Sequence, residues 1–227
     1  MQRKRRTGRA GPRLIALLTG ALFAVLGACG PDRPRREAPP PPADTAPEIP
    51  AQSTGPTSRA DTLRDTLTVE GAAQPVALRL YRTPPGFPLP FSTYHPADLV
   101  PGAATSVEGG SVRFVAHFGG RRTDSAYVAV LVHPVEVDEE GARRALSAAT
   151  GGSGPAAPDQ QRHPWALAEY SGSTGPTVAR GILGRHEGQF FHVLIRYPAE
   201  FGDGFAPRAA LLLEHWQWED AGGGLGS

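Results

Sequence analysis

The start of the chain divides into a cationic stretch and an apolar stretch. Six basic residues lie before Leu14, and an apolar run from Leu14 to Ala28 follows them. This run is shorter than the roughly 20 apolar residues that a transmembrane helix needs. A basic start followed by a short apolar run is typical of a secretory signal peptide, so the pattern predicts an export signal over residues 1–28.

Beyond residue 63, short alternations of apolar and polar residues recur between turn-forming residues. Alternation with a period of two is typical of half-buried β-strands. The clearest hairpin is predicted around Gly119 and Gly120, and a second one around the turn at residues 71–75. The predicted strands cover residues 67–69, 76–81, 91–94, 112–118, 126–133, 165–170, 177–183, 189–197 and 216–218.

Two segments show helical patterns instead. Asp138 is a good N-cap, and the apolar residues that follow it at helical spacing predict a surface helix over residues 138–149. A second helix is predicted over residues 205–214, with Asp203 as its cap. Consecutive hairpins with two segregated helices predict the α+β fold class, as an antiparallel sheet with two main helices packed on it.

The residues between the export signal and the first strand have a different composition. They are rich in proline and nearly free of large apolar residues, so they cannot bury a core. We expect a disordered tether over residues 29–62, one folded domain over residues 63–219, and a flexible glycine-rich tail over residues 220–227.

The junction between the apolar run and the tether carries a short motif, Leu26-Gly27-Ala28-Cys29. It resembles the bacterial lipobox. The resemblance implies cleavage before Cys29 and acylation of this residue with chains such as palmitate, which would anchor the protein to a membrane. Cys29 is the only cysteine, so it has no disulfide partner within the chain. The alternatives are an uncleaved anchor and a secretory signal that is cut elsewhere. Gly30 favours the outer membrane facing the periplasm over the cytoplasmic membrane.

The order of predicted elements also resembles the PsbP/Mog1-like sandwich. The resemblance rests on an aromatic-proline strand start at Tyr94-His95-Pro96, a second aromatic-proline pair at Tyr197-Pro198, and a final strand with Trp216 and Trp218. It covers about residues 91–218. It implies a non-catalytic binding or assembly module with an envelope protein as partner. The group has no shared catalytic motif, so no catalytic residue is implied.

Charge and motif content narrow the function classes. After removal of the signal peptide, 23 − 6 = 17 basic residues face 22 acidic ones, which excludes the basic stripe that nucleic-acid binding needs. The sequence contains no hydrolase elbow, zinc-protease, disulfide-reductase or nucleotide-binding motif in a fitting context. The seven histidines lack the spacing of metal ligands. We therefore expect no catalytic residues, no cofactor and no metal site, and the pattern favours no oligomeric state.

One set of candidate ligand-binding residues follows from strand alternation. Arg113 and His117 share a face of one predicted strand, and His192 and Arg196 share a face of another. If these strands are neighbours, the four side chains form a cationic patch that suits a phosphate or carboxylate. The alternatives are a solvated sheet face and histidines hydrogen-bonded beneath a helix.

These observations predict a membrane-anchored envelope lipoprotein, with Cys29 as the lipidated residue and the domain as a non-catalytic binding or assembly module. The alternative function is a hydrolase or a small anionic-ligand-binding protein that uses the arginine and histidine face.

Overall fold

The computed structural model describes residues 59–106, 109–152 and 154–226. The predicted signal peptide, Cys29 and the tether up to residue 58 lie outside these described residues. Within them, no helix has the length and apolar character needed to cross a membrane.

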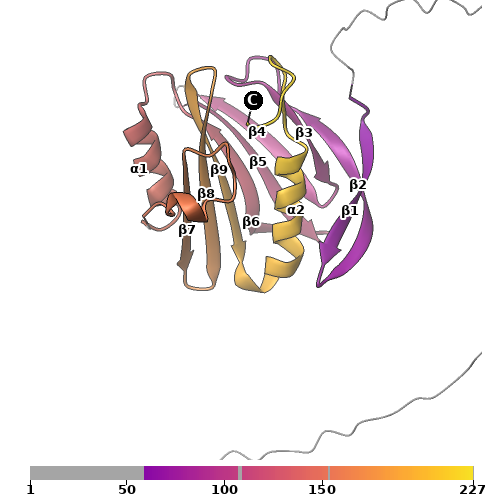
Figure 1. Cartoon of the computed structure of the whole chain (residues 1–227). Helices are drawn as coiled ribbons and strands as arrows, with labels where there is room; N and C mark the ends of the chain where they lie inside the picture. The colour runs from indigo at the N-terminus through magenta and orange to yellow at the C-terminus, as the bar shows by residue number, and fades with distance from the viewer. Residues whose placement is uncertain (1–58, 107–108, 153, 227) are drawn as a thin grey trace, which may run out of the picture. The chain divides into compact units, whose positions relative to one another are not determined.

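The described residues form two antiparallel sheets (Figure 1). The smaller sheet has four strands in the order β1-β2-β3-β10, and the larger one has six in the order β4-β5-β6-β9-β8-β7. The strands of the smaller sheet are β1 (Thr62–Val69), β2 (Ala72–Arg82), β3 (Phe91–Pro96) and β10 (Gln217–Trp218). Those of the larger sheet are β4 (Leu99–Ser106), β5 (Gly109–Phe118), β6 (Arg121–Val132), β7 (Ala168–Thr174), β8 (Thr177–His186) and β9 (Gln189–Pro198).

The hairpins follow from local turn chemistry. β5 pairs with β6 around Gly119 and Gly120, whose φ angles of 56° and 77° suit glycine in a tight turn, and this confirms the clearest predicted hairpin. The first hairpin is tighter than predicted. Glu70 and Gly71 make the turn with φ angles of 52° and 78°, so residues 72–75, which we expected in the turn, begin β2 instead.

The main core lies between the two sheets. Helix α2 (Gly202–Glu214) contacts β1 and β3 of the smaller sheet and β9 of the larger sheet, so it bridges them. Trp216, just after α2, stacks on Phe91 with ring centroids 3.7 Å apart. Alternate residues of the larger sheet complete this core, and buried members include Phe114, Val128, Val130, Ile182, Phe191 and Val193.

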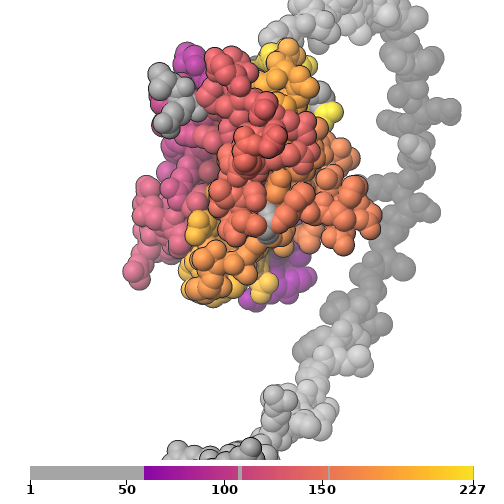
Figure 2. All heavy atoms as spheres, turned by 90° about the vertical axis from the view of Figure 1, so that its left-hand side faces the viewer, coloured from indigo at the N-terminus to yellow at the C-terminus, as the bar shows by residue number. Residues whose placement is uncertain are grey.

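Helix α1 (Glu139–Ala149) packs on the opposite face of the larger sheet, on the side that faces the viewer in Figure 2. The Asp138 side chain accepts a hydrogen bond from the Gly141 N–H at 2.8 Å and caps the helix, as predicted. Leu146 lies directly over Gly181 of β8, where a Cβ would approach the Leu146 side chain to 2.5 Å. Glycine at position 181 therefore allows α1 to sit close to the sheet.

The predicted α+β class, with two helices packed on one antiparallel sheet in a PsbP/Mog1-like layout, is wrong. The described residues hold ten strands in two sheets and only two α-helices, which makes the fold β-rich. The physical reason is that β1, β2, β3 and β10 separate into a second sheet. Phe91 and Trp218 of this sheet pack into the main core, whereas α1 packs in a separate cluster outside it.

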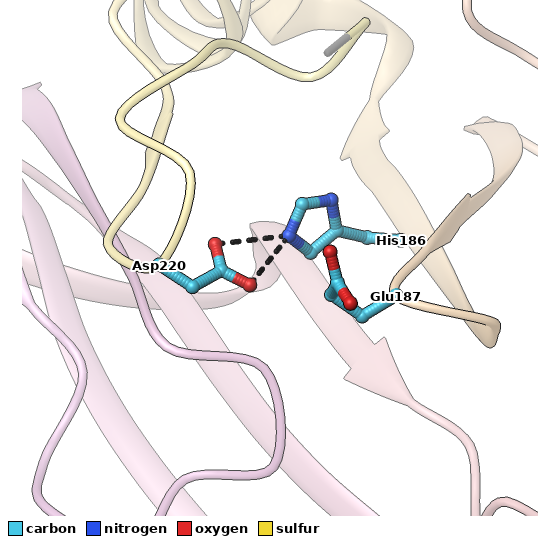
Figure 3. Close-up of side chains that lie close together, drawn as sticks. All are labelled: His186, Glu187 and Asp220. Atoms are coloured by element: carbon cyan, nitrogen blue, oxygen red, sulfur yellow. Dashed lines mark hydrogen bonds and ion pairs between the residues drawn. The ribbon is translucent and has the colours of Figure 1, made fainter.

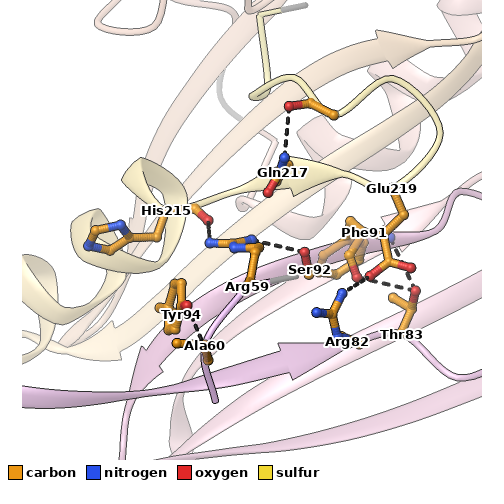
Figure 4. Close-up of polar contacts among 11 residues, drawn as sticks. Arg59, Ala60, Arg82, Thr83, Phe91, Ser92, Tyr94, His215, Gln217 and Glu219 are labelled. Atoms are coloured by element: carbon orange, nitrogen blue, oxygen red, sulfur yellow. Dashed lines mark hydrogen bonds and ion pairs between the residues drawn. The ribbon is translucent and has the colours of Figure 1, made fainter. Parts of the chain in front are cut away.

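Two contacts fix the ends of the domain. The guanidinium of Arg59 donates to Ser92 Oγ at 2.9 Å and to the His215 carbonyl at 2.8 Å, and it lies 4.5 Å from the centre of the Tyr94 ring (Figure 4). At the other end, Leu225 packs into the main core. The chain on the N-terminal side of the domain is thus held at Arg59, where β1 is about to begin.

Candidate functional site

The four predicted ligand-binding residues do not form one patch. β6 lies between β5 and β9, so the strands that carry them are not neighbours. His117 pairs with Arg122 and His192 pairs with Leu131, which places the two histidines 131 − 122 = 9 positions apart along β6. Strand alternation identified residues that share a face, but it could not identify which strands pair.

The arginines of that set lie on either side of one aromatic residue. The guanidinium of Arg113 stacks on the Tyr127 ring with 3.6 Å between its central carbon and the ring centre. Arg196 is the register partner of Tyr127 on β9. Arg113 also donates to the Asp124 carbonyl at 2.9 Å. Some of the N–H donors of the Arg113 guanidinium are thus already bound within the sheet.

His192 is buried against a second histidine. Its Nδ1 lies 3.1 Å from Nε2 of His133, and the two side chains form a hydrogen-bonded pair in the interior. Burial, followed by the nearby His133, lowers the pKa of His192 to about 3, and burial also lowers the pKa of His133. This matches the alternative reading of satisfied interior histidines rather than a ligand-binding face.

A hollow lies elsewhere in the described part of the chain, between α2 and the strands β7, β8 and β9. Its volume is about 220 Å³. One wall is apolar, and the mouth is polar and charged. The apolar wall comes from Ile182, Ile195, Ala206, Ala210 and Leu213, and the charged side chains are Arg162, His163, Glu169 and Arg180.

Glu169 organises the mouth of this cavity. A single oxygen of its carboxylate, Oε1, accepts three hydrogen bonds: from the backbone N–H of Arg162 at 2.8 Å, from that of His163 at 2.7 Å, and from the His163 ring at 3.0 Å. The Glu169 side chain is only 12% exposed. The carboxylate therefore holds the loop before β7 in place and neutralises donors that would otherwise face the cavity.

Arg180 has a different position in the cavity. It lies on β8 between Ser171 of β7 and Ile195 of β9, and it is half-buried. Its guanidinium makes no hydrogen bond or ion pair with any other described residue. A partly buried guanidinium keeps five N–H donors in a rigid planar fork. Arg180 is therefore a half-buried donor group at this cavity that is free for a ligand.

A third cluster ties the C-terminal segment to the sheet. His186 Nε2 lies 2.9 and 3.0 Å from the two carboxylate oxygens of Asp220, and Glu187 lies beside them (Figure 3). The His186 ring stacks on Trp218 with centroids 4.0 Å apart. Burial raises the pKa of Asp220, but hydrogen bonds from His186 and the Ala221 N–H outweigh it and lower the pKa overall.

These three side chains could also hold a divalent cation. Their ligand-type atoms lie within 4.8 Å of one another, and a histidine with two carboxylates is a possible donor set. However, Asp220 and His186 are already hydrogen-bonded to each other, and this contact acts as a clip between the two segments. We therefore read the cluster as a link between the C-terminal segment and the end of β8.

Sequence reasoning missed the cavity residues. Arg180 alternates with the inward-facing Val178 and Ile182, and Glu169 is the charged residue in the otherwise apolar predicted segment 165–170. A charged residue in phase with the buried face of a strand was the available signal.

No protein-family model, curated protein or solved structure matches this chain.

Proposed function

We propose that this chain is an exported lipoprotein, anchored at Cys29, whose domain binds a small ligand in the cavity between α2 and β7–β9. The observation that carries the binding part is Arg180, a half-buried guanidinium that lines this cavity and makes no ion pair with another described residue. Ligand pockets commonly combine an apolar lining with a few placed polar groups.

The anchoring part of the proposal rests on the sequence. The cationic start, the apolar run and Leu26-Gly27-Ala28-Cys29 stand in the order of a lipoprotein signal. The arrangement of Arg59 supports a tethered domain, because this residue fastens the chain where the proline-rich segment ends and the first strand begins. A proline-rich spacer with a fixed attachment point would hold the domain away from the membrane surface.

The choice of binding over catalysis rests on how the groups at the cavity are used. Glu169 accepts three N–H donors on one oxygen, and this commits it to positioning the loop. The Ser171 hydroxyl lines the cavity, but no hydrogen bond joins it to a histidine or carboxylate among the described residues. A serine nucleophile would need such a base within reach.

The anchor is tested by intact mass and membrane fractionation of the wild type beside Cys29→Ala, in a bacterium that processes lipoproteins. The proposal predicts a mature wild-type chain that starts at an acylated Cys29 and sediments with membranes. The variant should lack the acyl mass and leave the membrane fraction. A soluble, unacylated wild-type product would contradict the anchor.

The cavity is tested by a thermal-shift screen of small carboxylates, amines, alcohols and sugars. At least one class should raise the unfolding temperature of the wild type. The shift should disappear in Ala210→Trp, which fills the cavity from the exposed side of α2. Ala148→Trp, at an exposed position of α1, is the matched control and should keep the shift. A screen in which no class acts would contradict a ligand-binding role.

A further inference from the structure

The lining of the cavity next to α2 is partly apolar and partly cationic. Ile182, Ile195 and Leu213 give it an apolar wall, and Arg180 and Arg162 bring positive charge to its mouth. From this asymmetry, and resting on the proposed binding function, we infer that the ligand is a small amphiphilic monoanion, a carboxylate with a short aliphatic tail. The carboxylate would lie against Arg180 and the tail against the apolar wall.

The charge at the mouth fits a monoanion. Two guanidinium groups, of Arg162 and Arg180, stand against one carboxylate, of Glu169, which leaves one net positive charge when His163 is counted as neutral. The hydrogen bonds to the loop use only Oε1 of Glu169, but the two guanidinium groups would repel an ammonium group beside this carboxylate. A dianion such as a phosphate monoester would leave one charge uncompensated and would face the Glu169 carboxylate.

The geometry of Arg180 favours a carboxylate head group. A guanidinium presents two parallel N–H donors that match the two oxygens of a carboxylate. Ser171, the register partner of Arg180 on β7, adds a hydroxyl on the same stretch of the cavity wall. The head group thus has a bidentate donor and a further hydrogen-bonding group within one pair of strands.

The volume sets the length of the tail. A cavity of about 220 Å³ is equivalent to roughly seven waters, or on the order of ten carbon and oxygen atoms. A second hollow adjoins it along α2 and shares His163, Ala210 and Leu213 with it. Glu214 lines that second hollow. Its negative charge would repel a carboxylate, so the head group is directed to the Arg180 end.

Isothermal titration with octanoate, octanol and octylamine tests this inference on the whole mature chain, residues 29–227, produced without acylation as Cys29→Ser. Octanoate should bind about tenfold more tightly than octanol, because a charge-assisted hydrogen bond is lost with the carboxylate. Octylamine should not bind measurably. Arg180→Gln should reduce octanoate binding to the octanol level, and Arg180→Lys should restore part of the difference.

Arg185→Gln is the matched control. Arg185 lies on the same strand but is exposed, and its guanidinium lies near the Phe190 ring instead of the cavity. This variant should keep the preference for octanoate. Equal binding of octanoate and octanol, unchanged in Arg180→Gln, would overturn the carboxylate inference while leaving the ligand-binding role intact. A preference for octylamine would also overturn it. If none of the three probes binds and the thermal-shift screen finds no other ligand, the proposed function itself fails.

Discussion

The imidazole rings of His133 and His192 meet in the interior of the domain, with Nε2 of His133 3.1 Å from Nδ1 of His192. His133 is 5% exposed and His192 is 6% exposed. One hydrogen bond between two ring nitrogens requires at least one neutral ring, and burial, which lowers the pKa of both His133 and His192, favours the neutral form of both. Protonation of both rings would place two positive charges side by side in a poorly solvated site.

This pair predicts that the domain loses stability in mild acid. The pKa of His192 is about 3 in the folded state, against 6.5 for an unperturbed histidine. Between these values the unfolded chain binds a proton that the folded chain does not, so stability is full above about pH 6.5 and falls as the pH drops towards 3. The expected loss from His192 is about 1.4 kcal/mol per pH unit well inside this window.

Urea unfolding of the wild type and of His192→Gln between pH 7.5 and 4.5 measures this effect. Glutamine keeps a hydrogen-bonding group but cannot take up a proton. The variant should start from a lower stability at pH 7.5 and lose less of it on acidification, with a slope smaller by about one proton. Identical pH slopes in the two proteins would show that His192 is not the group responsible.

At Gly184, the addition of a single methyl group is expected to destabilise the domain strongly. A Cβ at this position would lie 2.4 Å from the tip of the Phe191 ring, which is fully buried in the main core. Gly184→Ala should therefore lower the free energy of unfolding by about 1–3 kcal/mol, through displacement of a packed aromatic ring. Urea unfolding monitored by circular dichroism measures it.

Gly102→Ala is the control for that experiment, because a Cβ on this exposed β4 residue would have nothing within 4 Å. Its effect should stay within about 0.5 kcal/mol. Equal destabilisation by both substitutions would mean that the loss of glycine in a strand, and not the contact with Phe191, sets the cost.

The contacts of Arg59, in the segment that joins the tether to the domain, are expected to stabilise the folded domain. Its guanidinium makes two hydrogen bonds and a cation–π contact, to Ser92, His215 and Tyr94. Arg59→Ala should lower the free energy of unfolding by about 1–2 kcal/mol. Arg64→Ala removes an exposed arginine of β1 and should have an effect near zero. If both variants unfold at the same urea concentration as the wild type, the Arg59 contacts do not hold in solution.

Loss of the Asp220 contact, which would release the C-terminal segment, is expected to lower the stability of the domain. Asp220→Ala removes the partner of His186, which is itself buried, and leaves an imidazole N–H or lone pair without a hydrogen bond. The expected cost is about 1–3 kcal/mol, and each kcal/mol lowers the unfolding temperature by about 2–4 °C in a domain of this size. Differential scanning calorimetry measures it, with the exposed Asp61→Ala as control. An unchanged unfolding temperature would remove the structural role of the clip.

Local patterns predicted the elements that local physics determines. The β5–β6 hairpin and the α1 cap at Asp138 each depend on residues close together in the chain, and both are as expected. The pairing of β3 with β10 joins residues such as Phe91 and Trp218, which are far apart in sequence. Alternation reports which side of a strand is buried but not which strand lies next to it, so the division into two sheets was not predictable.

The same limit explains the misplaced ligand patch. A patch with His117 and His192 required their strands to be neighbours, but β6 lies between them. Arg180 was recognisable in principle, because it interrupts the inward-facing apolar series of Val178 and Ile182. That signal would have marked an unusual residue. The signal could not have shown that α2, which lies far along the sequence, closes the cavity.

The most direct test of the account is to locate bound octanoate by amide chemical-shift mapping on the isotopically labelled mature chain. The largest shifts should come from Arg162 to Trp165, from β7 and β8 around Ser171 and Arg180, and from the second half of α2. Shifts centred on the Arg113, Tyr127 and Arg196 face, or an absence of shifts at saturating octanoate, would contradict the claim that this cavity is the binding site.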